Sequence, residues 1–117
     1  MQIKQYQDWT INTAVYPGAG SRNFGEALYL VLGLASEAGE VAGKLKKIVR
    51  GDEVTPEAFI SELSDVLWYL ARICSHADIT LEDLADFNYA KLTKRQETNT
   101  IQGDGDTRES VIVTDNA

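Results

Sequence analysis

Two pairs of acidic residues are the feature of this 117-residue chain whose type and spacing could do chemistry. They are Glu37 with Glu40, and Glu62 with Asp65. Each pair lies in an apolar run of helical periodicity, where a spacing of three places two carboxylates on one face. Two such helices side by side would direct four carboxylates into one pocket. Four carboxylates that close together can all stay ionised only if cations lie between them. Oxygen ligands favour hard ions, so the sequence predicts a site for Mg²⁺ or Mn²⁺ before Zn²⁺.

The alternative interpretation is that these acids belong to a solvated helical face. Their phase argues against it, because at about 100° per residue Glu37 falls beside Leu30 and Ile48, at the edge of the core stripe. Glu62 likewise falls at the edge of an apolar stripe on its own helix. The acids therefore border a packing surface, and a phosphate-bearing substrate is the usual partner of such a metal site.

Composition limits the class of protein. Hydrophobic residues make up 44% of the chain and charged residues 25%, which is ordinary for a soluble globular domain. We expect a single domain over residues 1–117, with a helical core over about 3–96 and a Gly- and Asp-containing tail over 97–117. The net charge of −7 argues against a nucleic acid polymer as partner, whereas a small anion bridged by metal ions remains compatible.

Cysteine usage and the apolar runs predict a cytoplasmic protein. The single cysteine, Cys74, lies in an apolar run, and we expect it in the core and not as a nucleophile. The chain does not open with a basic segment and an apolar stretch, so no signal peptide is expected. Its apolar runs are far shorter than a membrane span, so no membrane partner is expected either.

Apolar periodicity and helix-breaking residues predict an all-α four-helix bundle. Pro17 and the glycines around it end the first helix, and Gly51 ends the second. Thr55 caps the third helix with Pro56 at its first position, and Thr80 opens a capping box before the fourth. The four predicted helices cover about residues 3–15, 26–50, 56–75 and 81–95.

Two segments leave open questions about assembly and the tail. Residues 27–35 of the second helix are apolar nearly all round, so both sides should be covered, and a partner subunit is the simplest cover for one of them. We therefore expect a homo-oligomer. Residues 111–113 are compatible with a short strand or with a fraying end.

The order Glu-x-x-Glu and then Glu-x-x-Asp resembles the signature of the MazG-like, all-α nucleoside triphosphate pyrophosphohydrolases. Three surrounding blocks are similar to consecutive blocks of that family: GLASEAGEVAGKLKK, ELSDVLWYLA and NYAKLTKR. The tail QGDGDTR resembles the ending of a phage and bacterial subgroup. The resemblance runs from about Ala27 to Arg108, which is most of the chain.

The resemblance implies a four-helix core that forms dimers or tetramers, and hydrolysis of an NTP or dNTP to the monophosphate and pyrophosphate. It implies that the four acids hold Mg²⁺, that Lys91 and Arg95 contact the phosphates, and that Asn88 contacts the sugar or a phosphate. The spacing of these last three residues agrees, because they fall on one face of the fourth helix. A plain basic surface stripe is the alternative interpretation.

Further candidates have two interpretations each. Lys44 follows Glu40 by one turn and is either a second phosphate contact or a helix ion pair with Glu40. Tyr69, one turn beyond Asp65, resembles a position that faces the nucleotide in some relatives, with a core aromatic as the alternative. Asn23 is a candidate for reading a base edge. Three other aromatic residues are expected in the core or at an interface: Trp9, Phe24 and Trp68.

These residues lead to the hypothesis of metal-assisted hydrolysis at the α-phosphorus, in which Glu37 or Glu40 orients or deprotonates the attacking water. Covalent catalysis is not expected, because the single His76 lies almost next to the single cysteine, near a helix end where it suits the helix dipole. In the tail, Asp106 and Arg108 are candidates to close over the substrate. The rival hypothesis is a non-catalytic helical scaffold or a nucleotide-sensing regulator.

Overall fold

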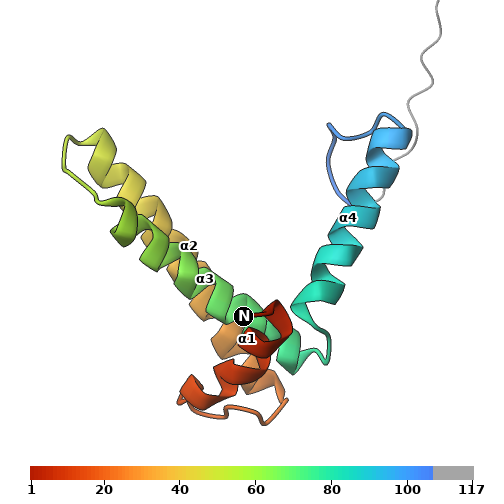
Figure 1. Ribbon diagram of the computed structural model, residues 1–117, viewed down its shortest axis with the longest axis horizontal. Helices are drawn as coiled ribbons and strands as arrows, with labels where there is room; N and C mark the ends of the chain where they lie inside the picture. The colour runs from red at the N-terminus through yellow and green to blue at the C-terminus, as the bar shows by residue number, and fades with distance from the viewer. Residues whose placement is uncertain (107–117) are drawn as a thin grey trace, which may run out of the picture. The chain divides into compact units, whose positions relative to one another are not determined.

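The computed structural model describes residues 1–106, and this part of the chain is all α-helical (Figure 1). The elements in order are α1 (Ile3–Trp9), a 3₁₀ turn η1 (Thr10–Thr13), α2 (Phe24–Val49), α3 (Pro56–His76) and α4 (Leu81–Glu97). The predicted all-α class with four helices is confirmed, and residues 1–106 contain no strand. Residues 111–113 and Arg108, for which the sequence raised hypotheses, lie outside the described residues.

The described part of the chain forms two compact units. The first, Met1–Glu82, is built on α2 and α3, which lie side by side and antiparallel, joined by a short loop (Figure 1). In this unit α1 and η1 pack against α3. The second unit begins at Asp83 and contains most of α4 and the loop that follows it. Within residues 1–106, no helix has the combination of length and apolar character that crossing a bilayer requires.

Local chemistry explains where α2 and α3 begin and end. The Asn23 side chain accepts a hydrogen bond from the Glu26 N–H at 3.0 Å, and the Thr55 hydroxyl accepts one from Ala58 N–H at 3.1 Å, which satisfies a free amide at each helix start. Pro56 occupies the first position of α3, as predicted. Gly51 follows α2 with a φ of +97°, a conformation that glycine adopts without a steric penalty.

The first helix is shorter than predicted. The expected helix over about 3–15 ends at Trp9 and continues as η1. Two threonine hydroxyls donate to carbonyl oxygens three residues earlier, Thr10 to Gln7 at 2.6 Å and Thr13 to Thr10 at 3.0 Å. Such side-chain bonds compete with the α-helical pattern and favour a tighter turn.

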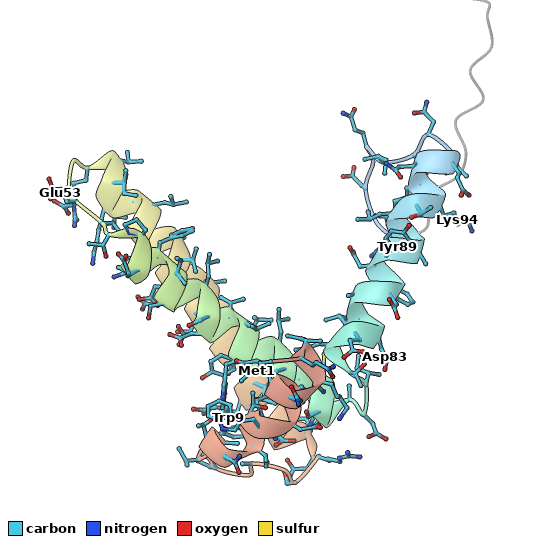
Figure 2. The ribbon with its side chains drawn as sticks, in the orientation of Figure 1. Met1, Trp9, Glu53, Asp83, Tyr89 and Lys94 are labelled. Atoms are coloured by element: carbon cyan, nitrogen blue, oxygen red, sulfur yellow. The ribbon has the colours of Figure 1, made fainter. Side chains whose placement is uncertain are left out.

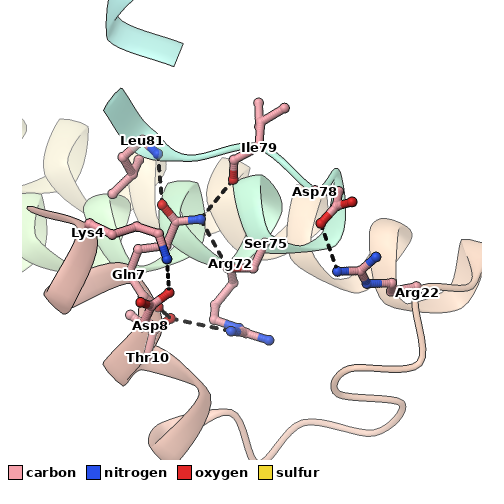
Figure 3. A network of polar contacts seen from close by, with 10 residues as sticks. All are labelled: Lys4, Gln7, Asp8, Thr10, Arg22, Arg72, Ser75, Asp78, Ile79 and Leu81. Carbon is pink, nitrogen blue, oxygen red and sulfur yellow. Dashed lines mark hydrogen bonds and ion pairs between the residues drawn. The ribbon is translucent and has the colours of Figure 1, made fainter. Parts of the chain in front are cut away.

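A buried glutamine joins the pieces of the first unit (Figure 3). Gln7 is 3% exposed, and its amide nitrogen donates to the Ser75 hydroxyl at 3.2 Å and to the Ile79 carbonyl at 2.9 Å. Its amide oxygen accepts from the Leu81 N–H at 2.8 Å, at the first residue of α4. Gln7 therefore anchors α1 to the end of α3 and supplies a partner for a free amide at the start of α4.

The fully buried apolar core is small for a chain of this length. Leu30, Ala71 and Cys74 are at most 2% exposed, and the expectation that Cys74 is a core residue is confirmed. By contrast, Val31 and Leu32 on α2 are 54% and 61% exposed. The apolar face that led us to expect a partner subunit is thus open in the single chain, and the oligomer stays a prediction.

Candidate metal centre and the aromatic hollow beside it

Three of the four predicted acids come together in the first unit. Glu37 comes from α2, and Glu62 and Asp65 come from α3. One carboxylate oxygen of each residue lies within 4.8 Å of the others, and we call these three residues the acidic group. Glu37 and Glu62 are partly buried, whereas Asp65 is exposed. Because the group spans two helices, the packing of α2 on α3 determines its geometry.

Glu40 does not belong to the acidic group, although it was predicted as a ligand and as a candidate base. Its side chain is exposed on α2, one turn beyond Glu37. Its charge is nevertheless one of those that raise the pKa of Glu37. Both proposed roles of Glu40 stay predictions.

The electrostatics of the acidic group fit a cation. Burial raises the pKa of Glu37, and the charges of Asp65, Glu62 and Glu40 raise it further. The donor set consists of carboxylate oxygens only, which is the chemistry that Mg²⁺ and Mn²⁺ prefer over softer metals. The residues present therefore fit a hard divalent ion.

Lys44 supplies a positive charge beside the acidic group. Its ammonium nitrogen lies 3.7 Å from a carboxylate oxygen of Glu62, with both side chains about one-fifth exposed. The sequence left open a phosphate contact or a pair with Glu40 on the same helix. The ion pair instead runs across to α3, where it joins the two helices that carry the acids. The phosphate contact stays a prediction.

Aromatic side chains form a surface hollow of about 360 Å³ next to the acidic group, which we call the aromatic hollow. It is lined by Trp9, Thr13, Trp68 and Tyr69, together with Glu37 and Asp65. The rings of Trp68 and Tyr69 meet edge to face with their centres 5.0 Å apart, and the Trp68 indole N–H donates to the Thr13 hydroxyl at 2.8 Å. The volume lies at the lower end of the range for small-molecule pockets.

The hollow changes the interpretation of three aromatic residues. Trp9 and Trp68 were expected in the core or at an interface, but both line the hollow. Tyr69 lies there with Asp65, as its position one turn away on the same helix predicted. Burial raises the pKa of Tyr69, and Tyr29 and the nearby carboxylates add to this effect. The Tyr69 hydroxyl therefore keeps its proton at neutral pH and can donate a hydrogen bond.

Gly33 gives Tyr69 its place against α2. A β-carbon at Gly33 would overlap the Tyr69 ring, so the ring rests on bare helix backbone. Glycine within a helix costs about 1 kcal/mol relative to alanine, so its presence calls for a packing reason. The sequence carried this signal, a glycine in the middle of an apolar helical run, but it did not show which side chain needs the space.

The predicted cations of α4 lie in the second unit. Lys91 and Arg95 both pair with the Asp106 carboxylate, at 3.1 and 3.6 Å, and Arg95 also donates to the Gly105 carbonyl at 3.2 Å. The two cations therefore share one face, as their spacing predicted. Asn88 is exposed on the same helix. The union of these residues with the acidic group in one site stays a prediction.

Comparison with known proteins agrees with the resemblance seen in the motifs. Residues 26–100, more than half of the chain, match the sequence model of the MazG nucleotide pyrophosphohydrolase domain. The chain belongs to the MazG family. It is similar to the gene 37 protein of Mycobacterium phage L5, with 40% identity over 114 residues that cover 92% of this chain and 100% of the phage protein. No solved structure gave a significant match.

The MazG match includes the acidic group but not the whole hollow. Trp9 and Thr13 precede residue 26 and lie outside the matched MazG residues, so that part of the wall comes from α1 and η1. Asn23 also precedes them, and its side-chain oxygen caps α2. The proposed base contact of Asn23 stays a prediction. Sequence reasoning did not find Thr13, because no local pattern shows that a threonine of a 3₁₀ turn faces Trp68.

Proposed function

We propose that this MazG protein is a metal-dependent nucleoside triphosphate pyrophosphohydrolase, which converts an NTP or dNTP to the monophosphate and pyrophosphate. The observation that carries the proposal is the convergence of three carboxylates, from α2 and α3, at the edge of an aromatic hollow. The acids offer a place for phosphate-bound cations, and the rings offer a place for a base. Family membership supports the same class of reaction.

In this proposal the acidic group and Glu40 hold Mg²⁺, or Mn²⁺ in its place. When bound, the metal supplies charge neutralisation on the phosphates and lowers the pKa of a bound water. Glu37 or Glu40 orients the attacking water and accepts its proton. The water oxygen bonds to the α-phosphorus, and the bridging oxygen leaves with the electron pair as part of pyrophosphate.

The remaining residues bind the substrate in this proposal. The rings of Trp68 and Tyr69 contact the base, because stacked or edge contacts with aromatic side chains suit every base. Cationic side chains contact the phosphates, since guanidinium and ammonium groups form charge-assisted hydrogen bonds with them. The proposed contacts outside the hollow are Lys44, Lys91 and Arg95 with the phosphates, Asn88 with the sugar or a phosphate, and Asn23 with the base.

A substrate panel tests the proposal. The full-length protein is incubated with Mg²⁺ and each common NTP and dNTP, and pyrophosphate and orthophosphate are measured separately. We expect pyrophosphate and monophosphate in equal amounts. Orthophosphate without pyrophosphate, in protein free of contaminating pyrophosphatase, would refute the mechanism. Nucleotide binding without turnover would favour a nucleotide-sensing regulator, and neither binding nor turnover would favour a scaffold.

Two glutamine variants test whether the turnover measured in the panel depends on the acidic group. Glu37→Gln should reduce turnover by at least about a hundredfold, as expected when a metal ligand or general base is lost. Glu53→Gln removes the same charge from the α2–α3 loop, which Figure 2 shows at the opposite end of the helix pair from Trp9. It should leave turnover unchanged. Equal losses in both variants would point to net charge and not to the site.

A further inference from the structure

A buried carboxylate outside the acidic group has no role in the chemistry proposed so far. Glu26 lies in the first turn of α2 and is 1% exposed. Its Oε2 accepts hydrogen bonds from the Tyr16 hydroxyl at 2.9 Å and from the Gly20 N–H. Its Oε1 accepts one from the Arg22 N–H at 3.3 Å and lies 2.7 Å from His76 Nδ1. One side chain thus joins the loop before α2 to the end of α3.

Helix capping does not explain this arrangement. A glutamate three positions after the N-cap residue commonly reaches back to the N-cap amide. Here the Asn23 side chain caps α2 through the Glu26 N–H, and the Glu26 carboxylate turns to the loop and to His76. A buried carboxylate costs several kcal/mol unless it is fully hydrogen-bonded, and here the Tyr16 hydroxyl, two loop amides and His76 meet that condition.

A series of aromatic contacts leads from Glu26 to the hollow. The Tyr16 ring, 7% exposed, stacks on Tyr29 with centres 4.9 Å apart and meets Trp68 edge to face at 6.2 Å. Trp68 in turn meets Tyr69, and both line the aromatic hollow. The Tyr16 hydroxyl is the polar end of this series, and Glu26 is its acceptor. Trp68 is therefore in contact with a ring whose hydroxyl is hydrogen-bonded to Glu26, in addition to its own indole bond to Thr13.

The surroundings keep Tyr16 in the donor form. Burial raises the pKa of Tyr16; nearby Arg72 lowers it and Glu26 raises it, and the net shift is upward. Arg72 is 5% exposed and also donates to the Thr10 hydroxyl at 3.4 Å. Tyr16 thus keeps its proton and donates to a carboxylate, which is stronger than a bond between two neutral groups.

We infer that Glu26 is a positioning residue for the aromatic hollow, which fixes Trp68 through Tyr16 and so sets the affinity for the base of the nucleotide. It does not touch the substrate. The inference rests on the proposed function of the hollow. It adds that Glu26, which does not line the hollow, determines the affinity for the base.

Two variants break the connection at either end. Tyr16→Phe removes only the hydroxyl, and Glu26→Gln keeps the size of the side chain but removes its charge. We expect each to raise KM for the preferred triphosphate about fivefold or more, because Trp68 is then less well preorganised for the base, with kcat changed less than twofold. Thr55→Ala, which removes the cap of α3, is the matched control for general destabilisation and should leave KM unchanged.

Two measurements separate positioning from loss of structure. Binding of dAMP, dCMP, dGMP and dTMP is titrated in EDTA by tryptophan fluorescence, and the dissociation constant of the preferred monophosphate should rise by the same factor as KM. The double variant should be no worse than either single variant, because both changes break one connection. Additive effects, or equal effects in Thr55→Ala, would overturn the inference.

A third measurement does not depend on nucleotide chemistry. In a Trp9→Phe background the only indole is that of Trp68, and acrylamide quenching reports its exposure. Tyr16→Phe should raise the quenching constant about twofold or more, whereas Thr55→Ala should not. If the wild-type protein binds and hydrolyses no nucleotide, the proposed function fails, and this result still shows whether Glu26 and Tyr16 hold Trp68. Unchanged quenching in a folded Tyr16→Phe protein would overturn the positioning inference. If Glu26→Gln does not fold, the inference is tested with Tyr16→Phe alone.

Discussion

Replacing Glu37 with glutamine should stabilise the metal-free protein and remove most of its stabilisation by Mg²⁺. The acidic group places three carboxylate oxygens within 4.8 Å of one another. At about 5 Å, two unit charges repel by about 1 kcal/mol in water and by about 3 kcal/mol at an effective dielectric constant of about 20. Asp65 is exposed and Lys44 offsets part of the charge of Glu62, so the lower value applies to both contacts. Relief of the two contacts should stabilise the metal-free variant by about 2 kcal/mol.

The pH dependence gives an independent check of the sign. The pKa of Glu37 is raised in the folded state, so the native protein binds this proton more tightly than the unfolded chain does. Stability from this group is therefore present at low pH and lost as pH rises through the unfolded and then the folded pKa. The stability gained by Glu37→Gln over the wild type should accordingly grow across that range and level off above it.

The assay is urea unfolding followed by helical circular dichroism, in EDTA and in excess Mg²⁺. A ligand at a hundred times its dissociation constant adds about 2.7 kcal/mol to the wild type, and we expect this gain to be largely lost in Glu37→Gln. Glu53→Gln, with the same change in net charge, should keep it. A Glu37→Gln protein that is less stable than wild type in EDTA, or one that keeps the full Mg²⁺ gain, would refute the assignment of the acidic group as a metal site.

Three further predictions follow from particular contacts. Burial alone would raise the pKa of Glu26, but its hydrogen bonds to His76, Gly20, Tyr16 and Arg22 lower it to about 2. The free energy of unfolding should therefore fall by up to about 3 kcal/mol as pH falls from about 4.3 toward 2. Acid unfolding curves of Glu26→Gln should lack this loss. Gly33→Ala should displace the ring of Tyr69 and raise KM severalfold. Gly39 has open space at its β-carbon, so Gly39→Ala should leave KM unchanged and add up to about 1 kcal/mol to the free energy of unfolding. Light scattering should show a homodimer or homotetramer, and Leu32→Glu, on the exposed apolar face of α2, should give a smaller species; a monomeric wild type would contradict the predicted assembly.

The helices could be predicted where local chemistry decides them. Thr55 and Pro56 define the start of α3 through one cap bond and one fixed φ, and both are visible in a stretch of a few residues. The end of α1 was predicted wrongly because two hydroxyl bonds, from Thr10 and Thr13, outweigh an apolar periodicity that would otherwise continue the helix.

Helical geometry predicts which acids of the acidic group lie on one face of the same helix, but not which acids of two different helices meet. A spacing of three places Glu62 and Asp65 on one face of α3, and the structure has them together. Which residue of α2 meets them depends on how far α2 is shifted along α3, a quantity set by side-chain packing over the whole interface. That shift brings Glu37 into the group and leaves Glu40 one turn beyond, a distinction that identical spacing in the sequence does not contain.

Glu26 shows why the remaining part of the site was not visible. Glu26 in the first turn of α2 and His76 in the last turn of α3 each suit the dipole of their own helix. Because this local explanation is sufficient for each residue, the sequence does not indicate that they are in contact across 50 positions of the chain. What distinguishes them is burial, because a dipole partner gains nothing from being 1% exposed. The burial of Glu26 is unfavourable unless Tyr16, Gly20 and Arg22 are brought to it, so the carboxylate organises the loop and, through Tyr16, the ring that backs the hollow.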